Sequence, residues 1–198
     1  MRFIPQSYKL FIMNRLAEIS GISLIGLALT IFAVLFTYSP LDPSLNNITD
    51  LKSQNVLGIT GAIIADLLMQ LFGSSSFLIF LFLLAWSYRL IMFKNLRLFA
   101  INFFAAILGI IILDVIFLLL KINILHGFIS LEFNKILINT LVFNNSLYLN
   151  ITYAIIVFCL FLFLFIVACG LSLKIWKKSF YNLWKIIKFL LNYVIKVL

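Results

Sequence analysis

Four stretches of this sequence are apolar, almost free of charge, and long enough to cross a lipid bilayer. A helix rises 1.5 Å per residue, so about 20 apolar residues span the roughly 30 Å of hydrocarbon in a membrane. The predicted spans are Ile19–Tyr38, a second span that begins at Leu67 or Ser75 and ends at Tyr88, Leu98–Leu120, and Ile151–Leu173. Because these runs are uniformly apolar and do not alternate, we predict an all-α, polytopic membrane protein with four transmembrane helices.

Composition supports the same class of protein. Hydrophobic residues make up 65% of the 198 residues and charged residues only 11%, which is more apolar surface than a soluble domain can bury. The two cysteines, Cys159 and Cys169, lie ten residues and so about 15 Å apart on one predicted helix, where they cannot form a disulfide with each other. We interpret both as packing residues and predict no metal site, cofactor or catalytic group.

The lysines and arginines predict how the chain is oriented. Short loops on the cytoplasmic side of a membrane carry an excess of these residues. Here 12 of the 15 fall in the N-terminal segment, the connection after the second span and the C-terminal tail, and the other three are Lys52, Lys121 and Lys135. We therefore predict a multi-pass membrane protein with both termini in the cytoplasm. Its predicted parts are a cytoplasmic segment at 1–18, a four-span membrane domain at 19–173 and a cytoplasmic tail at 174–198.

The tail has the pattern of a basic amphipathic helix. At 100° per residue its six lysines fall within an arc of roughly 100°, and apolar residues such as Trp176 and Ile187 lie opposite them. This pattern is typical of a helix that lies on a membrane surface and binds anionic lipid headgroups. The basic residues flank spans and do not cover a soluble domain, so we predict no direct DNA binding by this chain.

A definite stop follows the first span, in the phrase TYSPLDPS at residues 37–44. Pro40 and Pro43 cannot continue a helix, and each favours an extended conformation in the residue before it. Tyr38 suits the membrane interface, with its ring among the headgroups and its hydroxyl in water. Asp42 can bond nearby backbone amides and shape a compact turn.

The next phrase, NVLGITGAIIADLLMQLFG at residues 55–73, predicts a further helix on the outer side. Gly58, Gly61 and Ala65 form a smooth face of small residues that allows another helix to approach closely. Asp66 interrupts the apolar run, and Gly73 provides a break before the second span. We interpret the segment as an interfacial or re-entrant helix, and the alternative is one long second span that begins near Leu67.

These phrases, together with AWSYRL at residues 85–90, resemble the four-helix membrane domain at the N-terminus of the bacterial DNA translocase family FtsK/SpoIIIE. The residues that carry the resemblance are Tyr38, Pro40, Asp42, Pro43, Asn55, Gly58, Gly61, Ala65, Asp66, Phe72, Gly73 and Trp86. The resemblance implies a place at the division septum and a role in cell division and chromosome partition. It also implies association with division proteins, and with further copies of the chain, through helix faces.

Family members continue into a linker and a cytoplasmic ATPase motor, whereas this sequence ends at Leu198. None of its glycines is followed by lysine, so it lacks the G-x-x-x-x-G-K-[ST] loop that cradles phosphates. We expect no ATP hydrolysis by this chain, which is either an isolated membrane portion or a shortened relative. The predicted function is a non-enzymatic inner-membrane anchor of the division machinery.

One buried acid leaves a second function open. Asp114 lies six residues, about 9 Å, inside the outer end of the third span, where an ionised carboxylate is costly. We predict that it makes a packing hydrogen bond, with Thr37, Tyr38, Thr152 and Tyr153 as candidate donors at comparable depth. The alternative is a proton or ion pathway in a small transporter or channel component. His126, in the following loop, is interpreted as a surface residue.

Overall fold

The structure is a computed structural model that describes residues 5–122, 124–140, 147–172, 174–178, 181–182, 184–185 and 188. Its elements are α1 (Gln6–Phe36), α2 (Gly58–Phe72), the 3₁₀ helix η1 (Gly73–Phe77), α3 (Leu78–Phe93), α4 (Phe99–Leu119), α5 (Phe128–Thr140) and α6 (Leu147–Cys169). The described part of the chain contains no strand, which confirms the all-α prediction. Four helical stretches in it are long and apolar enough to cross a membrane, so the chain is a multi-pass membrane protein.

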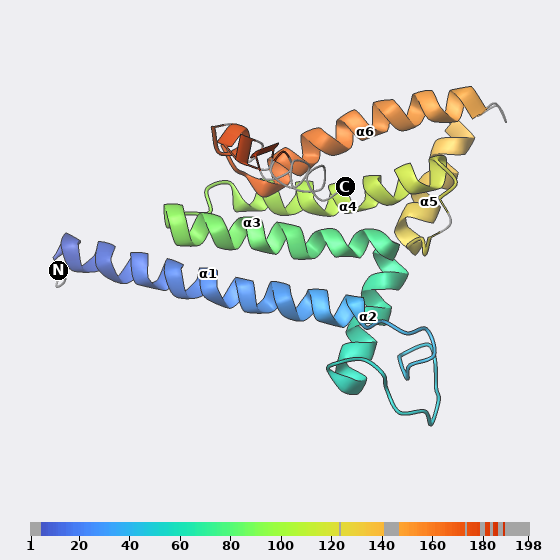
Figure 1. The fold of residues 1–198 in the computed structure, drawn as a ribbon, viewed down its shortest axis with the longest axis horizontal. Helices are drawn as coiled ribbons and strands as arrows, with labels where there is room; N and C mark the ends of the chain where they lie inside the picture. Colours follow the sequence, from blue (N-terminus) through green and yellow to red (C-terminus); the bar gives the residue numbers. More distant parts are fainter. Residues whose placement is uncertain are drawn as a thin grey trace.

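The four long helices α1, α3, α4 and α6 lie alongside one another (Figure 1). Their most extensive contacts join α1 to α3 and α4 to α6, so the bundle consists of two helix pairs with thinner contact between α3 and α4. The two ends of the bundle differ in content. We call the end that holds the last turn of α1 together with α2, η1 and α5 the junction end. The opposite end, which holds the α3–α4 turn at residues 94–98 and the last turn of α6, is the turn end.

The segment at residues 58–77 bears on the two interpretations of the second span. In Figure 1, α2 crosses the junction end at a steep angle to α1 and α3, and η1 connects it to α3. Gly73, the first residue of η1, has a φ of +59°, a backbone conformation that glycine adopts without strain. The chain breaks at Gly73 as predicted, so α2 is a separate helix and one uninterrupted helix that begins near Leu67 is not observed. The whole stretch Gly58–Phe93 is long and apolar enough to cross a membrane, and the interfacial or re-entrant placement of α2 stays a prediction.

The first helix is longer than its charge-free run. α1 begins at Gln6 and ends at Phe36, whereas the third span, predicted at Leu98–Leu120, is observed at Phe99–Leu119. An ion pair between Arg15 and Glu18 lies on one face of the early α1 turns, at the i,i+3 spacing that supports a helix outside the hydrocarbon. Segment 1–18 therefore continues directly into the first span from Gln6 onward.

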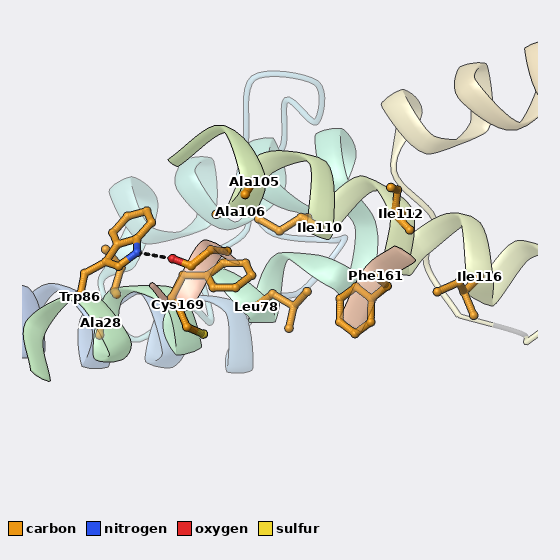
Figure 2. Close-up of a cluster of buried hydrophobic side chains, with 13 residues drawn as sticks. Ala28, Leu78, Trp86, Ala105, Ala106, Ile110, Ile112, Ile116, Phe161 and Cys169 are labelled. Carbon is orange, nitrogen blue, oxygen red and sulfur yellow. Dashed lines mark hydrogen bonds between the residues drawn. The ribbon is translucent and has the colours of Figure 1, made fainter. Parts of the chain in front are cut away.

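Small residues lie where the helices come closest. Ala28 of α1 and Ala168 of α6 have no exposed surface. A side chain at Gly21 of α1 would come within 2.6 Å of Ile91 on α3, and the neighbouring Ser87 hydroxyl donates to the Gly21 carbonyl at 2.7 Å. Larger apolar residues pack in the core, as Figure 2 shows for Leu78, Trp86, Ile110 and Phe161. Close approach at small residues with hydrogen bonds between helices is typical of membrane bundles.

The tail falls only partly within the described residues. Residues 174–178 are helical, and the Trp176 ring lies 5.9 Å from Phe165 of α6. Most of the predicted amphipathic helix at 174–198, including Lys196, lies outside the described residues, so its lipid contacts stay a prediction.

Candidate functional site

Asp42 organises the connection between α1 and α2 at the junction end. Its side chain is buried, and the carboxylate accepts hydrogen bonds from the backbone N–H groups of Gln54 at 2.9 Å and Asn55 at 3.0 Å, and from the Ser53 hydroxyl at 3.1 Å. A carboxylate that accepts from backbone amides makes strong, charge-assisted bonds. The turn predicted from TYSPLDPS therefore exists, but its aspartate bonds a segment 11 to 13 residues further along the chain.

Asn55 fastens the start of α2 to the end of α1. The last carbonyls of a helix have no partner within that helix. Asn55 Nδ2 donates to the Val34 carbonyl at 2.9 Å, and its Oδ1 accepts from the Leu57 N–H at 3.2 Å. The Thr37 hydroxyl adds a second tie because it accepts from the Val56 N–H at 3.2 Å. The Asn55 side chain thus acts as a donor to α1 and as an acceptor at the start of α2, and its amide group supplies both.

Gly61 and Ala65 form the predicted small-residue face of α2, and this face is buried inside the chain itself. A side chain at Gly61 would overlap Oδ1 of Asn55, and Ala65 has no exposed surface. The close approach that the pattern indicated is therefore made within this chain, by α2 and the segment that precedes it. The face is not a free surface for a partner helix.

Tyr38 and Asp66 belong to a row of hydrogen-bonded polar side chains at the surface of the junction end. The Tyr38 hydroxyl donates to Asp66 at 3.4 Å, Gln70 Nε2 donates to the other Asp66 oxygen at 2.7 Å, and Asn46 Nδ2 donates to Gln70 at 2.5 Å. The expected place of Tyr38 at the membrane interface stays a prediction, and both Tyr38 and Asp66 are half-exposed. Pro40 contributes its carbonyl, which accepts from Asn47 Nδ2 at 3.2 Å.

Asp114 has no exposed surface and is the centre of a second cluster at the junction end. One carboxylate oxygen lies 3.1 Å from Nδ1 of His126, and the other accepts from the Gly127 N–H at 2.8 Å and from the Ser130 hydroxyl. Asp114 thus makes hydrogen bonds within its own chain, and its packing role stays a prediction. The donors proposed at Thr37 and Tyr38 are wrong, because both residues bond near the α1–α2 connection.

The interpretation of His126 is also corrected by this cluster. It was interpreted as a surface residue, but its ring contacts a fully buried carboxylate and only 18% of its side chain is exposed. Sequence reasoning missed it, together with Gly127 and Ser130, because the chain must first reverse after α4. The available signal was the short HGFIS phrase, in which a glycine and a serine three residues later open α5.

Two glycines allow the chain reversal between α4 and α5 to pack directly against η1. The Ser74 N–H donates to the Leu125 carbonyl at 2.8 Å. A side chain at Gly73 would come within 2.5 Å of the Gly127 nitrogen, and one at Gly127 would meet the backbone of Phe72 at 2.5 Å. Two backbones can approach this closely only where neither residue has a Cβ. Gly73 therefore serves the contact between η1 and the start of α5 as well as the break in the chain.

The Asp114 cluster holds an aspartate, a histidine and a serine, yet its geometry is not that of a hydrolase. In a catalytic triad the histidine lies between the other two residues and takes the serine proton. Here Asp114 lies in the middle and bonds both His126 and Ser130. The carboxylate sits at the start of α5, where backbone N–H groups are unpaired and negative charge is stabilising. Among the described residues no group of three or more metal-ligating side chains gathers.

The turn end has polar ties of its own. Nε1 of Trp86 donates to the Ala168 carbonyl at 2.8 Å, the hydrogen bond drawn in Figure 2. Arg89, one turn further along α3, is 7% exposed and donates to the Arg97 carbonyl at 2.8 Å. With its amide oriented to satisfy both neighbours, Asn102 accepts from Arg89 and donates to the Val167 carbonyl at 3.0 Å.

Two further contacts stabilise the turn end. Gly170, just after α6, has a φ of +59°, and a side chain there would overlap the Arg89 guanidinium. Lys94, in the α3–α4 turn, forms an ion pair with Glu18 of α1 at 2.5 Å. Of all these residues only Trp86 was among the predicted site residues. Arg89, Asn102 and Gly170 were missed, because their contacts depend on how α3, α4 and the end of α6 pack together.

The motif residues thus form two clusters at the junction end and one tie at the turn end. Asp42, Asn55, Gly61 and Asp66 meet at the α1–α2 connection, whereas Gly73 lies with the Asp114 cluster. Gly58 begins α2 with a φ of +63° and open space beside it, and Phe72 is half-buried beside the core. Pro43 follows Asp42 in the loop and is half-buried. These residues make contacts within the chain and gather no reactive groups in a pocket.

The comparisons with known proteins place this architecture. Residues 13–173 match the family described as the 4TM region of DNA translocase FtsK/SpoIIIE. Proteins named DNA translocase FtsK are 36% identical over 87 residues in Bradyrhizobium diazoefficiens (44% of this chain, 10% of that protein) and 32% identical over 97 residues in Azospirillum brasilense (48% and 15%). The one in Rickettsia prowazekii is 44% identical over 63 residues (32% and 8%).

The matched segments thus cover only 8 to 15% of the length of these three relatives. No solved structure matches the chain. The match at 13–173 contains α1 from residue 13 onward, all of α3, α4 and α6, the junction end and the turn end. The chain therefore belongs to the family of the four-helix membrane region of the DNA translocases FtsK and SpoIIIE.

Proposed function

We propose that this chain is a non-enzymatic membrane anchor of the cell-division machinery, equivalent to the membrane part of a DNA translocase that acts in division and chromosome partition. The observation that carries the proposal is the match of residues 13–173 to the 4TM region of FtsK/SpoIIIE. The anchor lies in the bacterial inner membrane and gathers at the division septum. Its partners are division proteins, which contact exposed faces of the bundle.

The way the motif residues are used supports an anchor over a transporter. The described partners of Asp114 all come from the short segment at residues 126–130, where they fix the start of α5. Transporter sites near the midplane instead combine broken helices with several polar groups. At the junction end, Asp42 and Asn55 likewise bond backbone groups of their own chain. These polar residues hold helices in place, which is what a stable anchor requires.

For the orientation we propose that the turn end faces the cytoplasm and the junction end faces outward. Arg15, Lys94 and Arg97 lie toward the turn end, and Asp42 and Asp66 lie at the junction end. By the positive-inside rule, this distribution of charge supports a cytoplasmic position for both termini. Reporter fusions test it directly. Fusions at Lys52 and Asn134 are expected to report outside and fusions at Asn95 and Leu198 inside, whereas an inside signal at Lys52 would overturn the orientation.

The functional test uses the chain fused to a fluorescent protein at native expression level. We expect fluorescence at the division site of dividing cells without any motor fused to the chain. Asp42→Ala removes the acceptor for three donors and is expected to disperse the septal signal, since the outer surface loses its shape. Gly26→Ala is the matched control, because a side chain at Gly26 meets nothing within 4 Å. Uniform membrane fluorescence of the unchanged chain would contradict the anchor proposal.

A further inference from the structure

An apolar cavity of about 310 Å³ lies between α3 and α4. Its lining includes Ile79, Phe82 and Trp86 of α3 and Phe103, Ala106 and Ile110 of α4. Ile79 and Trp86 are seven residues apart, so the cavity follows α3 for about 10 Å. Because α3 packs mainly on α1, and α4 mainly on α6, the cavity marks the thin contact between the two helix pairs.

The lining restricts what can occupy this cavity. Its exposed surface is entirely apolar, and an apolar cavity of this kind does not hold ordered water. Its volume falls at the low end of ligand pockets, which span about 300 to 1,000 Å³. Helix–helix contacts in membranes use small residues, but Ala106 is the one small residue in this lining, and Phe82, Trp86 and Phe103 are bulky. A narrow, flexible alkyl chain fits this lining better than a helix.

One side of the cavity opens to the outside of the helix bundle. Phe103 lines it and is 43% exposed, so this residue reaches the surface that lipid covers in a membrane. Phe82 and Ile110, by contrast, are almost fully buried and form the inner wall. A lipid chain beside the bundle could therefore enter between α3 and α4 without opening either helix pair.

Positive charge lies at the turn end of the cavity. The Phe99 ring packs against Trp86 with 5.1 Å between centroids, which holds the start of α4 beside this end of the cavity. Arg97 precedes Phe99 by two residues and has an exposed side chain, and its carbonyl accepts from the buried Arg89. Each basic residue near a membrane surface favours anionic headgroups.

We propose that the α3–α4 cavity binds one acyl chain of an anionic phospholipid, whose phosphate lies beside Arg97 at the turn end. This site is separate from the lipid surface predicted for the tail and goes beyond the anchor function. The bound chain fills the gap between the helix pairs, so the lipid is a structural component of the bundle. The headgroup charge gives the selectivity, and the apolar lining gives the fixed position.

The test uses fluorescence from Trp86 in the full chain. Trp176→Phe and Trp184→Phe leave Trp86 as the single tryptophan, and the chain is reconstituted in zwitterionic vesicles that contain brominated lipid, which quenches a nearby indole. Brominated anionic phospholipid is expected to occupy the site with an apparent affinity about fivefold higher than brominated zwitterionic phospholipid of the same chain length. Arg97→Gln should reduce this ratio to about one. Lys121→Gln, which removes the same charge at the junction end, should leave the ratio unchanged.

A cavity variant separates the bound chain from lipids that merely surround the bundle. Ala106→Leu places a larger side chain in the cavity and should reduce the quenching of Trp86 by both brominated lipids. Equal quenching by anionic and zwitterionic lipid in the single-tryptophan chain would overturn the proposal, as would unchanged quenching in Ala106→Leu. Native mass spectrometry of the chain with all its tryptophans gives an independent readout. One anionic lipid per chain, lost in Ala106→Leu, supports the site, whereas a lipid-free dimer would assign the cavity to a second copy.

Discussion

Removing the Asp114 side chain should destabilise the junction end far more than removing its charge. In Asp114→Ala the Gly127 N–H, the Ser130 hydroxyl and the His126 ring all lose a partner inside a site with no exposed surface. Hydrogen bonds within membrane bundles average about 0.6 kcal/mol each, so three of them set a lower limit of about 2 kcal/mol. Loss of one partner from a buried charged network sets an upper limit of about 5 kcal/mol. We expect the free energy of unfolding to fall within this range.

Asp114→Asn is the matched variant, because it keeps the shape and removes the charge. The amide oxygen can still accept from the Gly127 N–H, and the amide nitrogen can donate to Nδ1 of His126 in the tautomer that leaves this nitrogen free. Ser130 retains its bond to the Gly127 carbonyl at 2.8 Å. The expected loss is therefore less than about 1.5 kcal/mol, the size of one net hydrogen bond.

The assay for both variants is reversible denaturation of the purified chain in mixed micelles, followed by circular dichroism. Limited proteolysis adds a local readout, since release of α5 should expose the connection at residues 121–127 before the rest of the bundle unfolds. A loss below about 1 kcal/mol in Asp114→Ala would refute the role assigned to this network. If Asp114→Asn stays folded and inserted but does not reach the septum, the charge itself matters, and the ion-pathway alternative gains support.

Three other substitutions test the remaining ties by the same denaturation assay. Gly61→Ala would force its methyl group against Asn55 and should cost about 1 to 3 kcal/mol, whereas the control Gly26→Ala should be neutral or slightly stabilising. Asn55→Asp turns a carboxylate oxygen toward the Val34 carbonyl, so the loss should be at least about 2 kcal/mol at neutral pH and should shrink in acid, where a protonated carboxyl can donate. Gly170→Ala combines a φ of +59° with overlap at a buried guanidinium and should cost about 2 kcal/mol or more.

The spans and the separate α2 could be predicted because they depend on local properties of the sequence. A charge-free run fixes the length of a membrane helix, and the observed α4 differs from its prediction by one residue at each end. Gly73 marked the break before the second span, and its positive φ agrees with that interpretation. The start of α1 was less predictable, because helices continue beyond the hydrocarbon where charged side chains pair along one face, as Arg15 and Glu18 do.

The partners of Asp114 could not be predicted in the same way. Depth along the third span placed Thr37 and Tyr38 at a similar level, but depth says nothing about which helix lies beside which. The true donors lie 12 to 16 residues later and reach Asp114 only because the chain reverses across Gly73 and Gly127. Such a contact depends on the tertiary fold, and the sequence alone shows only the residue types that permit it.

The distribution of these ties explains how two loosely joined helix pairs form one bundle. At the turn end, Trp86 and Arg89 of α3 bond segments around α4 and α6, so they connect the first pair to the second. At the junction end, the backbone of η1 crosses the start of α5, which Asp114 of α4 holds. Between these two ends α3 and α4 line an apolar cavity that opens to the side of the bundle. The pairs are therefore fixed to each other at both ends of the bundle, and the proposed lipid chain in the middle would complete the packing that the side chains leave open.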